Sequence, residues 1–190
     1  MTVQSTGHVM WSPDPSKLRY ASYTVDDLQS LPDDAPRVEL LDGVMRVLPA
    51  PTYDHQDIAG LLWFWLRKHA PRQFRASLAT GILVESNTTF EPDVLLVTAD
   101  VYGASHYAMP EQVPLVVEVV SRATQSRGRG RRALYASVGI AHYWRVEEDP
   151  VHVFAYDLVD GEYQLAADSD ERLVLTAPFE IDLAVRDIAP

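Results

Sequence analysis

The sequence contains no cysteine among its 190 residues and very little lysine. Without cysteine the chain can form no disulfide and offers no thiolate to a metal, which is typical of a reducing cytoplasm. Lysine occurs only at Lys17 and Lys68, so arginine supplies nearly all of the positive charge. No apolar run approaches the roughly 18 residues of a membrane span, and the N-terminus has no signal-peptide pattern. We therefore expect a cytoplasmic protein with no membrane partner.

Positive charge is scarce over most of the chain, whose formal net charge is −11. This balance argues against general affinity for nucleic acid, because binding to its backbone depends on cations that neutralise phosphates. Motifs of several other chemistries are missing: the sequence has no nucleophile elbow, no phosphate-binding loop and no dinucleotide fingerprint. The exception to the acidic balance is one cluster of arginines, which consists of Arg122, Arg127, Arg129, Arg131 and Arg132.

The pattern of apolar residues predicts a mixed α/β fold. Residues 53–70 have the periodicity of a helix that ends before Pro71. The run PDVLLV predicts a strand buried on both faces, PLVVEVV predicts another strand, and a helix is expected in RGRGRRALYASVG. The buried stripe of the first helix is expected to consist of Ile58, Leu61, Leu62, Trp65 and Leu66.

The turn signals and the domain boundaries complete the predicted organisation. The pairs Asp42-Gly43 and Asp160-Gly161 each lie between apolar runs, which is a strong signal for a two-residue hairpin turn. Residues 1–22 are polar and aperiodic and are expected to form a loose N-terminal arm. Residues 23–190 are expected to form a single domain.

Two acidic residues stand out because they lie in apolar strands. Asp93 opens the strand PDVLLV, and Glu118 interrupts PLVVEVV. A buried carboxylate is costly unless it is paired, protonated or bound to a metal. If the two strands are neighbours, the carboxylates could converge at one end of the sheet, where such oxygen ligands suit Mg²⁺ or Mn²⁺. The alternative is a structural role, in which each carboxylate forms an ion pair with an arginine.

Two further residues are weaker candidates. Glu39 lies in the first hairpin, and strand alternation alone favours a solvent-facing side chain for it. His55 lies in the first turn of the helix over residues 53–70, close to Asp54 and Asp57. A polar residue at a helix start is more common there than a catalytic one, and a role near a phosphate or a metal is the alternative.

The order of several segments is similar to that of a known family. VELLDG, PAPTYDHQ, EPDVLLV, PLVVEVVSRAT and ALYASVGIAHYWRVE together resemble the Uma2 family of restriction-endonuclease-like proteins, within the PD-(D/E)XK nuclease superfamily. The resemblance implies a restriction-endonuclease-like mixed central sheet flanked by helices, with an N-terminal β-hairpin and antiparallel C-terminal strands. It also implies an endonuclease that uses Mg²⁺ or Mn²⁺ to hydrolyse the phosphodiester bonds of DNA.

The resemblance assigns roles to individual residues. It implies that Asp93 and Glu118 are the metal-binding acids, that Glu39 is a third acidic ligand, and that His55 is the histidine of the family pattern. The family's lysine lies four residues before a tyrosine, which is Tyr135 here, so that Arg131 takes the lysine position. Arginine binds phosphate well, but it cannot act as a base. The neighbouring arginines that would bind the phosphate backbone are Arg127, Arg129 and Arg132.

Three functional interpretations remain open at this point. The first is a metal-dependent endonuclease, weakened by arginine at the lysine position. The second is a catalytically impaired nuclease-fold module that binds nucleic acid or a protein partner. The third is a dimeric structural domain in which Asp93 and Glu118 pair with arginines. A homodimer is expected from the number of apolar strands and from Tyr143 and Trp144, which we predict to be exposed.

Overall fold

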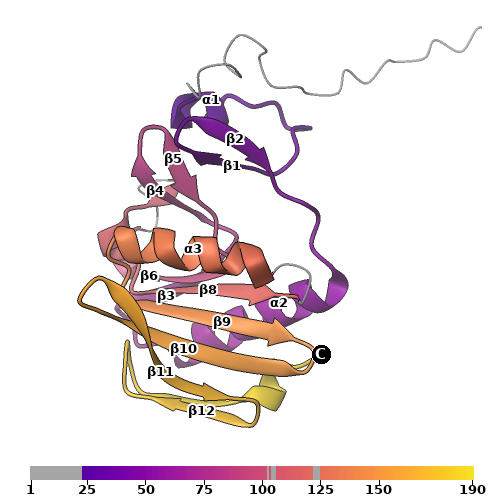
Figure 1. Ribbon diagram of the computed structural model, residues 1–190, viewed down its shortest axis with the longest axis vertical. Helices are drawn as coiled ribbons and strands as arrows, with labels where there is room; N and C mark the ends of the chain where they lie inside the picture. Colours follow the sequence, from indigo (N-terminus) through magenta and orange to yellow (C-terminus); the bar gives the residue numbers. More distant parts are fainter. Residues whose placement is uncertain (1–22, 102, 104–105, 122–124) are drawn as a thin grey trace, which may run out of the picture. The chain divides into compact units, whose positions relative to one another are not determined.

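The computed structural model describes residues 23–101, 103, 106–121 and 125–190, with residues 125–129 described by their backbone alone (Figure 1). The predicted N-terminal arm over residues 1–22 lies outside the described residues. The chain divides into two compact units, the first formed by Met1–Ala50 with Glu85–Phe90 and the second by Pro51–Val84 with Glu91–Pro190. The single domain over residues 23–190 stays a prediction, and each unit has its own description.

The first unit contains a short helix and the predicted hairpin. Helix α1 (Val25–Gln29) begins at Thr24, whose backbone N–H donates to the side chain of Asp27. Strands β1 (Val38–Leu41) and β2 (Val44–Val47) pair antiparallel. Asp42 and Gly43 connect them with φ values of 50° and 74°, the two positive values that a type I′ turn requires. The hairpin prediction is therefore confirmed. The third strand of the first unit is β5 (Thr88–Phe90).

The second unit is built on a six-stranded mixed sheet. Its strand order is β11-β10-β9-β8-β6-β3, in which β8 and β9 run parallel and the other neighbours run antiparallel. The strands are β3 (Phe74–Leu78), β6 (Val94–Thr98), β8 (Leu115–Val120), β9 (His142–Glu148), β10 (Val151–Val159) and β11 (Glu162–Ser169).

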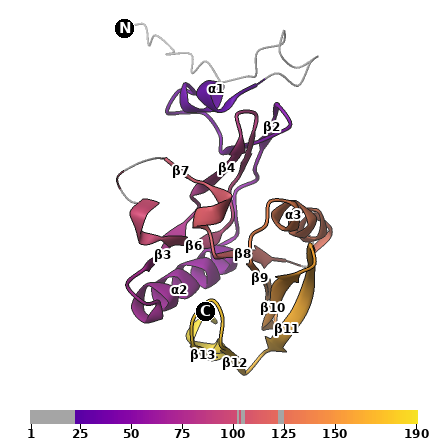
Figure 2. The same ribbon diagram turned by 90° about the vertical axis from the view of Figure 1, so that its left-hand side faces the viewer.

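Two helices cover opposite faces of this central sheet (Figures 1 and 2). Helix α2 (Tyr53–His69) packs on one face, which we call the α2 face. Helix α3 (Gln125–Ser137) packs on the other, the α3 face, and forms the crossover that connects the parallel strands β8 and β9. The predicted mixed central sheet flanked by helices is therefore confirmed. None of the helices in the described part of the chain is long and apolar enough to cross a membrane.

Shorter elements complete the second unit. Strands β12 (Arg172–Leu175) and β13 (Ile181–Ala184) form an antiparallel hairpin whose buried residues join the core on the α2 face. Strand β4 (Gly81–Glu85) begins in this unit and pairs in parallel with β7 (Tyr107–Ala108). Three short 3₁₀ helices lie at Ala99–Val101, Pro110–Gln112 and Val185–Asp187.

The packing corrects three of the burial predictions. Leu61 is 36% exposed, because it lies on the flank of the α2 stripe, and Ala59 is buried in its place. Tyr143 and Trp144 are each 1% exposed, so the prediction that they are exposed is wrong. Strand β9 is covered on both faces, and its successive side chains therefore enter opposite layers. The homodimer stays a prediction without the support of these two aromatic residues.

Candidate active site

Asp93 directly precedes β6, the strand that pairs with β8. The antiparallel ladder between these strands ends with the pair of Val94 and Val117. If its register continued by one residue, Asp93 would lie opposite Glu118. One step beyond the ladder, Oδ2 of Asp93 accepts a hydrogen bond of 2.8 Å from the backbone N–H of Val119. The two acids predicted from the sequence therefore belong to neighbouring strands, and β8 itself holds the Asp93 carboxylate.

His55 contacts the same carboxylate oxygen from α2. The helix begins at Thr52, whose hydroxyl accepts a hydrogen bond from the backbone N–H of His55. This cap places His55 in the first helical turn, with its Nε2 3.2 Å from Oδ2 of Asp93. Its Nδ1 is buried and has no hydrogen-bond partner among the described residues. The first turn of α2 thus contributes a histidine to the Asp93 end of the sheet.

The charge state of His55 reflects the acids around it. Burial acts to lower the pKa of His55, but the hydrogen bond and the charge of Asp93 outweigh it, so that the pKa lies above its ordinary value. The charges of Glu148 and Glu118 act in the same direction. In Glu148 itself burial raises the pKa of the carboxyl group, and the nearby His55 opposes that rise. Three carboxylates therefore act on a single imidazole.

Glu148 is a neighbour of His55 that was not predicted from the sequence. This residue is the last of β9, the strand that pairs in parallel with β8 through Val120 and Glu147. Because the carboxyl ends of parallel strands meet at one edge of a sheet, an acid at the end of β9 lies beside the end of β8. The acidic residues that close the segment YWRVEE were the available signal.

Glu118 is bound by α3 rather than by α2. It is 7% exposed, and its Oε1 accepts a hydrogen bond of 3.2 Å from Nη1 of Arg131. The hydroxyl of Tyr135 also donates to Oε1 of Glu118. Nη1 of Arg131 lies 3.0 Å from that hydroxyl as well. Arg131 and Tyr135 are four residues apart on α3, the spacing that brings two side chains onto one helix face.

Tyr135 is the second site residue that the analysis of the sequence did not select. It is completely buried, and burial followed by the charge of Glu118 raises the pKa of its hydroxyl well above the ordinary value. The group is therefore protonated at neutral pH and acts as a hydrogen-bond donor to Glu118. The available signal was its position four residues after Arg131.

Arg145 is a further cation that was missed. In the parallel register of β8 and β9 it is the direct partner of Glu118. Its Nη2 lies 3.0 Å from Oε1 of Glu147, and its guanidinium lies over the ring of Phe154 at 4.3 Å from the ring centroid. Its Nε is buried without a partner in the described part of the chain. A basic residue inside the strand segment YWRVE was the signal for it.

The remaining arginines of α3 divide into two groups. Arg127 and Arg129 lie in the helix, but their side chains are outside the described part, and Arg122 lies outside the described residues altogether. Arg132 donates through Nη2 to the backbone carbonyl of Tyr163, and its guanidinium lies 4.2 Å from the ring centroid of Tyr156. Arg132 therefore connects α3 to β10 and β11. The role of these arginines in phosphate binding stays a prediction.

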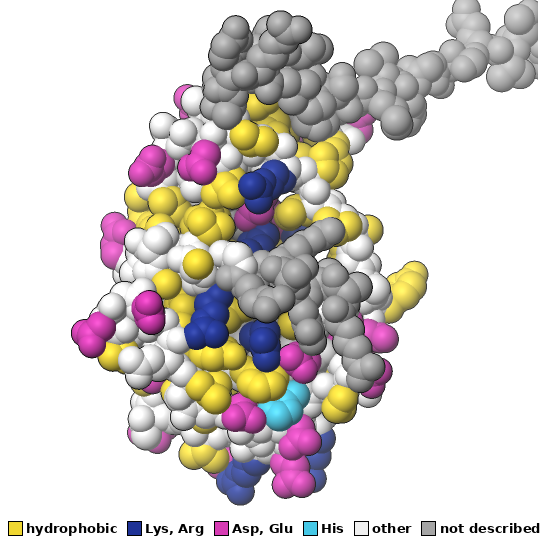
Figure 3. Space-filling view, viewed as in Figure 1, with side chains coloured by type: hydrophobic (Ala, Val, Ile, Leu, Met, Phe, Trp, Pro, Cys, Tyr) yellow, Lys and Arg dark blue, Asp and Glu magenta, His cyan; other side chains and the backbone are white. Residues whose placement is uncertain are grey.

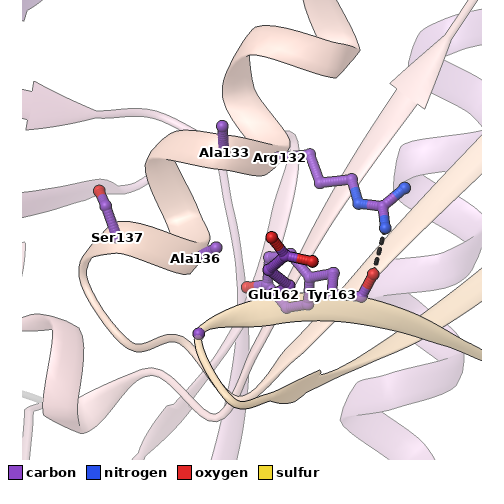
Figure 4. Close-up of a pocket in the computed structure, with 7 residues that line it drawn as sticks. Arg132, Ala133, Ala136, Ser137, Glu162 and Tyr163 are labelled. Carbon is purple, nitrogen blue, oxygen red and sulfur yellow. Dashed lines mark hydrogen bonds between the residues drawn. The ribbon is translucent and has the colours of Figure 1, made fainter.

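A surface pocket adjoins Arg132 at the C-terminal half of α3 (Figure 4). Its volume is about 490 Å³, and its walls come from α3, from the turn between β10 and β11, and from the first residues of β11. Basic side chains also gather near the middle of the face on which α3 lies (Figure 3). The lining residues of the pocket are Arg132, Ala133, Ala136, Ser137, Gly161, Glu162 and Tyr163.

Glu39 belongs to the first unit. It is 9% exposed in β1, so the preference for a solvent-facing side chain is wrong. Its role as a third metal ligand stays a prediction. Asp93, Glu118, His55 and Arg131 all belong to the second unit.

The donor set of the second unit is compatible with a divalent cation of the Mg²⁺ type. Among the described residues no group of three or more histidine and acidic side chains is arranged to hold a metal. Mg²⁺, however, is usually held by one or two carboxylates together with water and substrate phosphate. The described contacts of Asp93 go to Oδ2 and those of Glu118 go to Oε1.

Comparisons with known proteins agree with this fold. The sequence profile of the Uma2 family, described as "Putative restriction endonuclease", matches residues 25–186. Among solved structures, the chain is similar to a "putative nuclease belonging to DUF820" from Anabaena variabilis ATCC 29413. The two are 19% identical, the similarity covers 87% of this chain and 96% of that chain, and the TM-score is 0.69.

At this level of identity the structural likeness shows the fold alone, and the predicted nuclease-like fold is confirmed. No curated protein sequence matches the chain at a significant level. The family profile, in contrast, spans most of the sequence and includes both strand acids. The chain belongs to the Uma2 family.

Proposed function

We propose that the protein is a metal-dependent endonuclease that hydrolyses phosphodiester bonds of DNA, with its active site at the carboxyl ends of β8 and β9. The observation that carries this proposal is the position of Asp93 across the end of β8, in the register of Glu118. Membership of the Uma2 family and the nuclease-like fold support the reaction class. Ligand sites in open α/β sheets commonly lie at the carboxyl ends of parallel strands.

In this proposal Asp93 and Glu118 hold Mg²⁺ or Mn²⁺ through carboxylate oxygens. When bound, the cation activates water for attack and offsets the charge of the phosphate. The backbone N–H of Val119 and the imidazole of His55 hold Asp93 in place. Glu39 is proposed as a third ligand on the basis of the family pattern alone.

Arg131 is proposed as the cation that binds the phosphate. Its Nη1 donates to Glu118 and to Tyr135, and a guanidinium has five N–H donors in all. The fork geometry of arginine suits phosphate. Because arginine keeps its proton, Arg131 would stabilise charge and would not remove a proton from water.

A second candidate function is a binding module without catalysis. It is favoured by one observation, the pair between Arg131 and Glu118, since a carboxylate that is already neutralised by arginine has less need of a metal. In that case the protein would bind nucleic acid or a protein partner and would not cleave. The third interpretation requires arginines beside both acids, whereas the described partners of Asp93 are His55 and the backbone N–H of Val119.

A cleavage assay with matched variants tests the proposal. Supercoiled plasmid, single-stranded DNA and RNA are incubated with Mg²⁺ or Mn²⁺ and with wild type, Asp93→Asn or Glu118→Gln. We expect each variant to lose at least about 100-fold in rate, because removing a ligand costs more than the 10- to 100-fold typical of groups behind the ligands. The control is Asp182→Asn, which removes an exposed carboxylate of β13 and keeps activity.

The assay also separates the two functions. A wild-type protein that binds DNA but neither cleaves it nor binds Mn²⁺ in calorimetry would establish the binding module in place of the nuclease. Cleavage by wild type and by both acid variants at equal rates would remove Asp93 and Glu118 from the chemistry. Faster cleavage of RNA than of either DNA would change the proposed substrate and leave the site intact.

A further inference from the structure

The α3 face buries four tyrosines, Tyr135, Tyr143, Tyr156 and Tyr163, and the hydroxyl groups of Tyr135, Tyr143 and Tyr163 have different described partners. Tyr143 lies at the centre, with its ring 5.5–6.0 Å from those of Tyr135 and Tyr163. The hydroxyl of Tyr163 donates to the backbone carbonyl of Ile140 at 2.6 Å. That of Tyr143 is buried and has no partner among the described residues. Among these three hydroxyl groups, that of Tyr135 is the one with described contacts to charged side chains, those of Glu118 and Arg131.

The hydroxyl of Tyr135 joins Glu118 and Arg131. A phenol has one proton to donate and lone pairs to accept with. The proton goes to Oε1 of Glu118, and Nη1 of Arg131 donates to the phenol oxygen at 3.0 Å. Arg131 also donates directly to Oε1 of Glu118 at 3.2 Å. The three groups form a closed triangle in which each one fixes the direction of the other two.

This triangle determines how the Glu118 carboxylate is presented. Both described donors, Arg131 and Tyr135, bind the same carboxylate oxygen, Oε1. The ring of Tyr135 is completely buried, so the hydroxyl has a fixed position. A group that hydrogen-bonds to a metal ligand orients that ligand and tunes its affinity for the metal.

We propose that Tyr135 is a positioning residue, which holds the Glu118 carboxylate and the Arg131 guanidinium in the arrangement that a divalent cation and a substrate phosphate require. The inference rests on the proposed function, because it assigns Glu118 to the cation and Arg131 to the phosphate. Tyr135 itself touches neither. Its contribution is the orientation of the two groups that do.

Three single-atom deletions test this role. Tyr135→Phe removes the hydroxyl that contacts Glu118 and Arg131. Tyr163→Phe removes a buried hydroxyl with one backbone partner, and Tyr143→Phe removes a buried hydroxyl without a described partner. All three variants keep the aromatic ring in the same layer, so they differ in the contacts of the lost oxygen. The probe is Mn²⁺ alone, titrated into each protein by calorimetry.

We expect Tyr135→Phe to bind Mn²⁺ about 10-fold more weakly than wild type, within the range typical of groups that orient metal ligands. The affinities of Tyr163→Phe and Tyr143→Phe should stay within about twofold of wild type, since their oxygens do not contact a ligand. At saturating Mn²⁺, plasmid cleavage by Tyr135→Phe should show a lower kcat with an unchanged KM for DNA. That split separates orientation of the reacting groups from binding of the substrate.

Thermal unfolding followed by circular dichroism accompanies each titration. If Tyr135→Phe does not fold in buffer, the titration is repeated in sucrose, which favours the folded state. Wild-type affinity and wild-type kcat in Tyr135→Phe would overturn the inference and leave the proposed function standing. Equal losses in all three variants would also overturn it, because they would indicate general packing. A wild-type protein without Mn²⁺ binding and without cleavage would instead remove the proposed function, and this inference with it.

Discussion

The two faces of the central sheet are built from the same strands and have opposite chemistry. On the α2 face, side chains such as Val117 and Trp144 join an apolar core. On the α3 face, the residues next to them in sequence, Glu118 and Tyr143, belong to a layer of tyrosines, arginines and a carboxylate. Because side chains alternate along a strand, each strand of this pair contributes to both layers.

Most of the apolar core lies on the α2 face, whereas Glu118 and its described donors lie on the α3 face. The α2 face contains the buried residues of α2 and of the β12–β13 hairpin, and its contacts are apolar. The α3 face holds Glu118 and its two donors, which is a costly arrangement in an apolar layer unless the groups pair with one another. We therefore expect the α2 face to supply most of the folding free energy, and the α3 face, together with His55 in the first turn of α2, to supply the functional groups.

The largest change in the free energy of unfolding should follow from a cavity on the α2 face. Leu62 lies on the buried side of α2 and has no exposed surface. Leu62→Ala should lower the free energy of unfolding by about 3 kcal/mol, because it removes buried methyl groups and leaves a cavity. Urea unfolding at pH 7 measures the change.

The matched control lies two residues further along the same helix. Phe64 is 60% exposed, and Phe64→Ala should change the free energy of unfolding far less than Leu62→Ala does. Equal destabilisation by the two substitutions would contradict the assignment of the core to the α2 face. It would also indicate that the outer side of α2 is covered by something outside the described residues.

The elements of the fold were largely predictable because their signals are local. The turn at Asp42-Gly43 and the end of α2 before Pro71 depend on backbone preferences of the residues themselves. The burial of Tyr143 and Trp144 was not predictable, because it depends on helices that cover both faces of β9. A strand that is central and one that lies at an edge can have similar local sequences.

The site was predictable in its acids but not in their partners. Asp93 and Glu118 stood out because a charge in an apolar run requires an explanation. Their partners His55 and Tyr135 come from helices on opposite faces of the sheet. The order of strands in the sheet determines which helix lies beside each strand end. No single sequence segment contains that order.

A smaller loss of stability should follow when the pair on the α3 face is broken. Arg131→Met removes the described arginine partner of Glu118, which is largely buried and keeps the hydrogen bond from Tyr135. We expect the free energy of unfolding to fall by about 2 kcal/mol, less than for a fully buried pair because the Arg131 side chain is 19% exposed. Urea unfolding of Arg131→Met and of Arg131→Met/Glu118→Leu gives the comparison. If the double variant is no more stable than the single one, a Glu118 without this arginine partner is not the cause of the loss.

The smallest effect should come from an arginine–carboxylate pair on the surface, which sharpens the contrast with Arg131. Arg172 of β12 donates to Asp182 of β13, and both side chains are more than half exposed. Solvent and salt screen such a pair, so Arg172→Met should leave the urea midpoint at pH 7 almost unchanged.

The pair of Arg172 and Asp182 also predicts how folding stability changes with pH. The hydrogen bond from Arg172 holds the pKa of Asp182 below its ordinary value. A carboxyl group whose pKa is lower in the folded state stabilises the fold above its unfolded pKa, about 3.9, and that contribution is lost as the pH falls through the lower folded value. Wild type should therefore lose slightly more stability than Arg172→Met when the pH is lowered from 7 to 3, and 0.5 M NaCl should reduce the difference. A large loss at pH 7 in Arg172→Met would show that exposure does not distinguish this pair from the one on the α3 face.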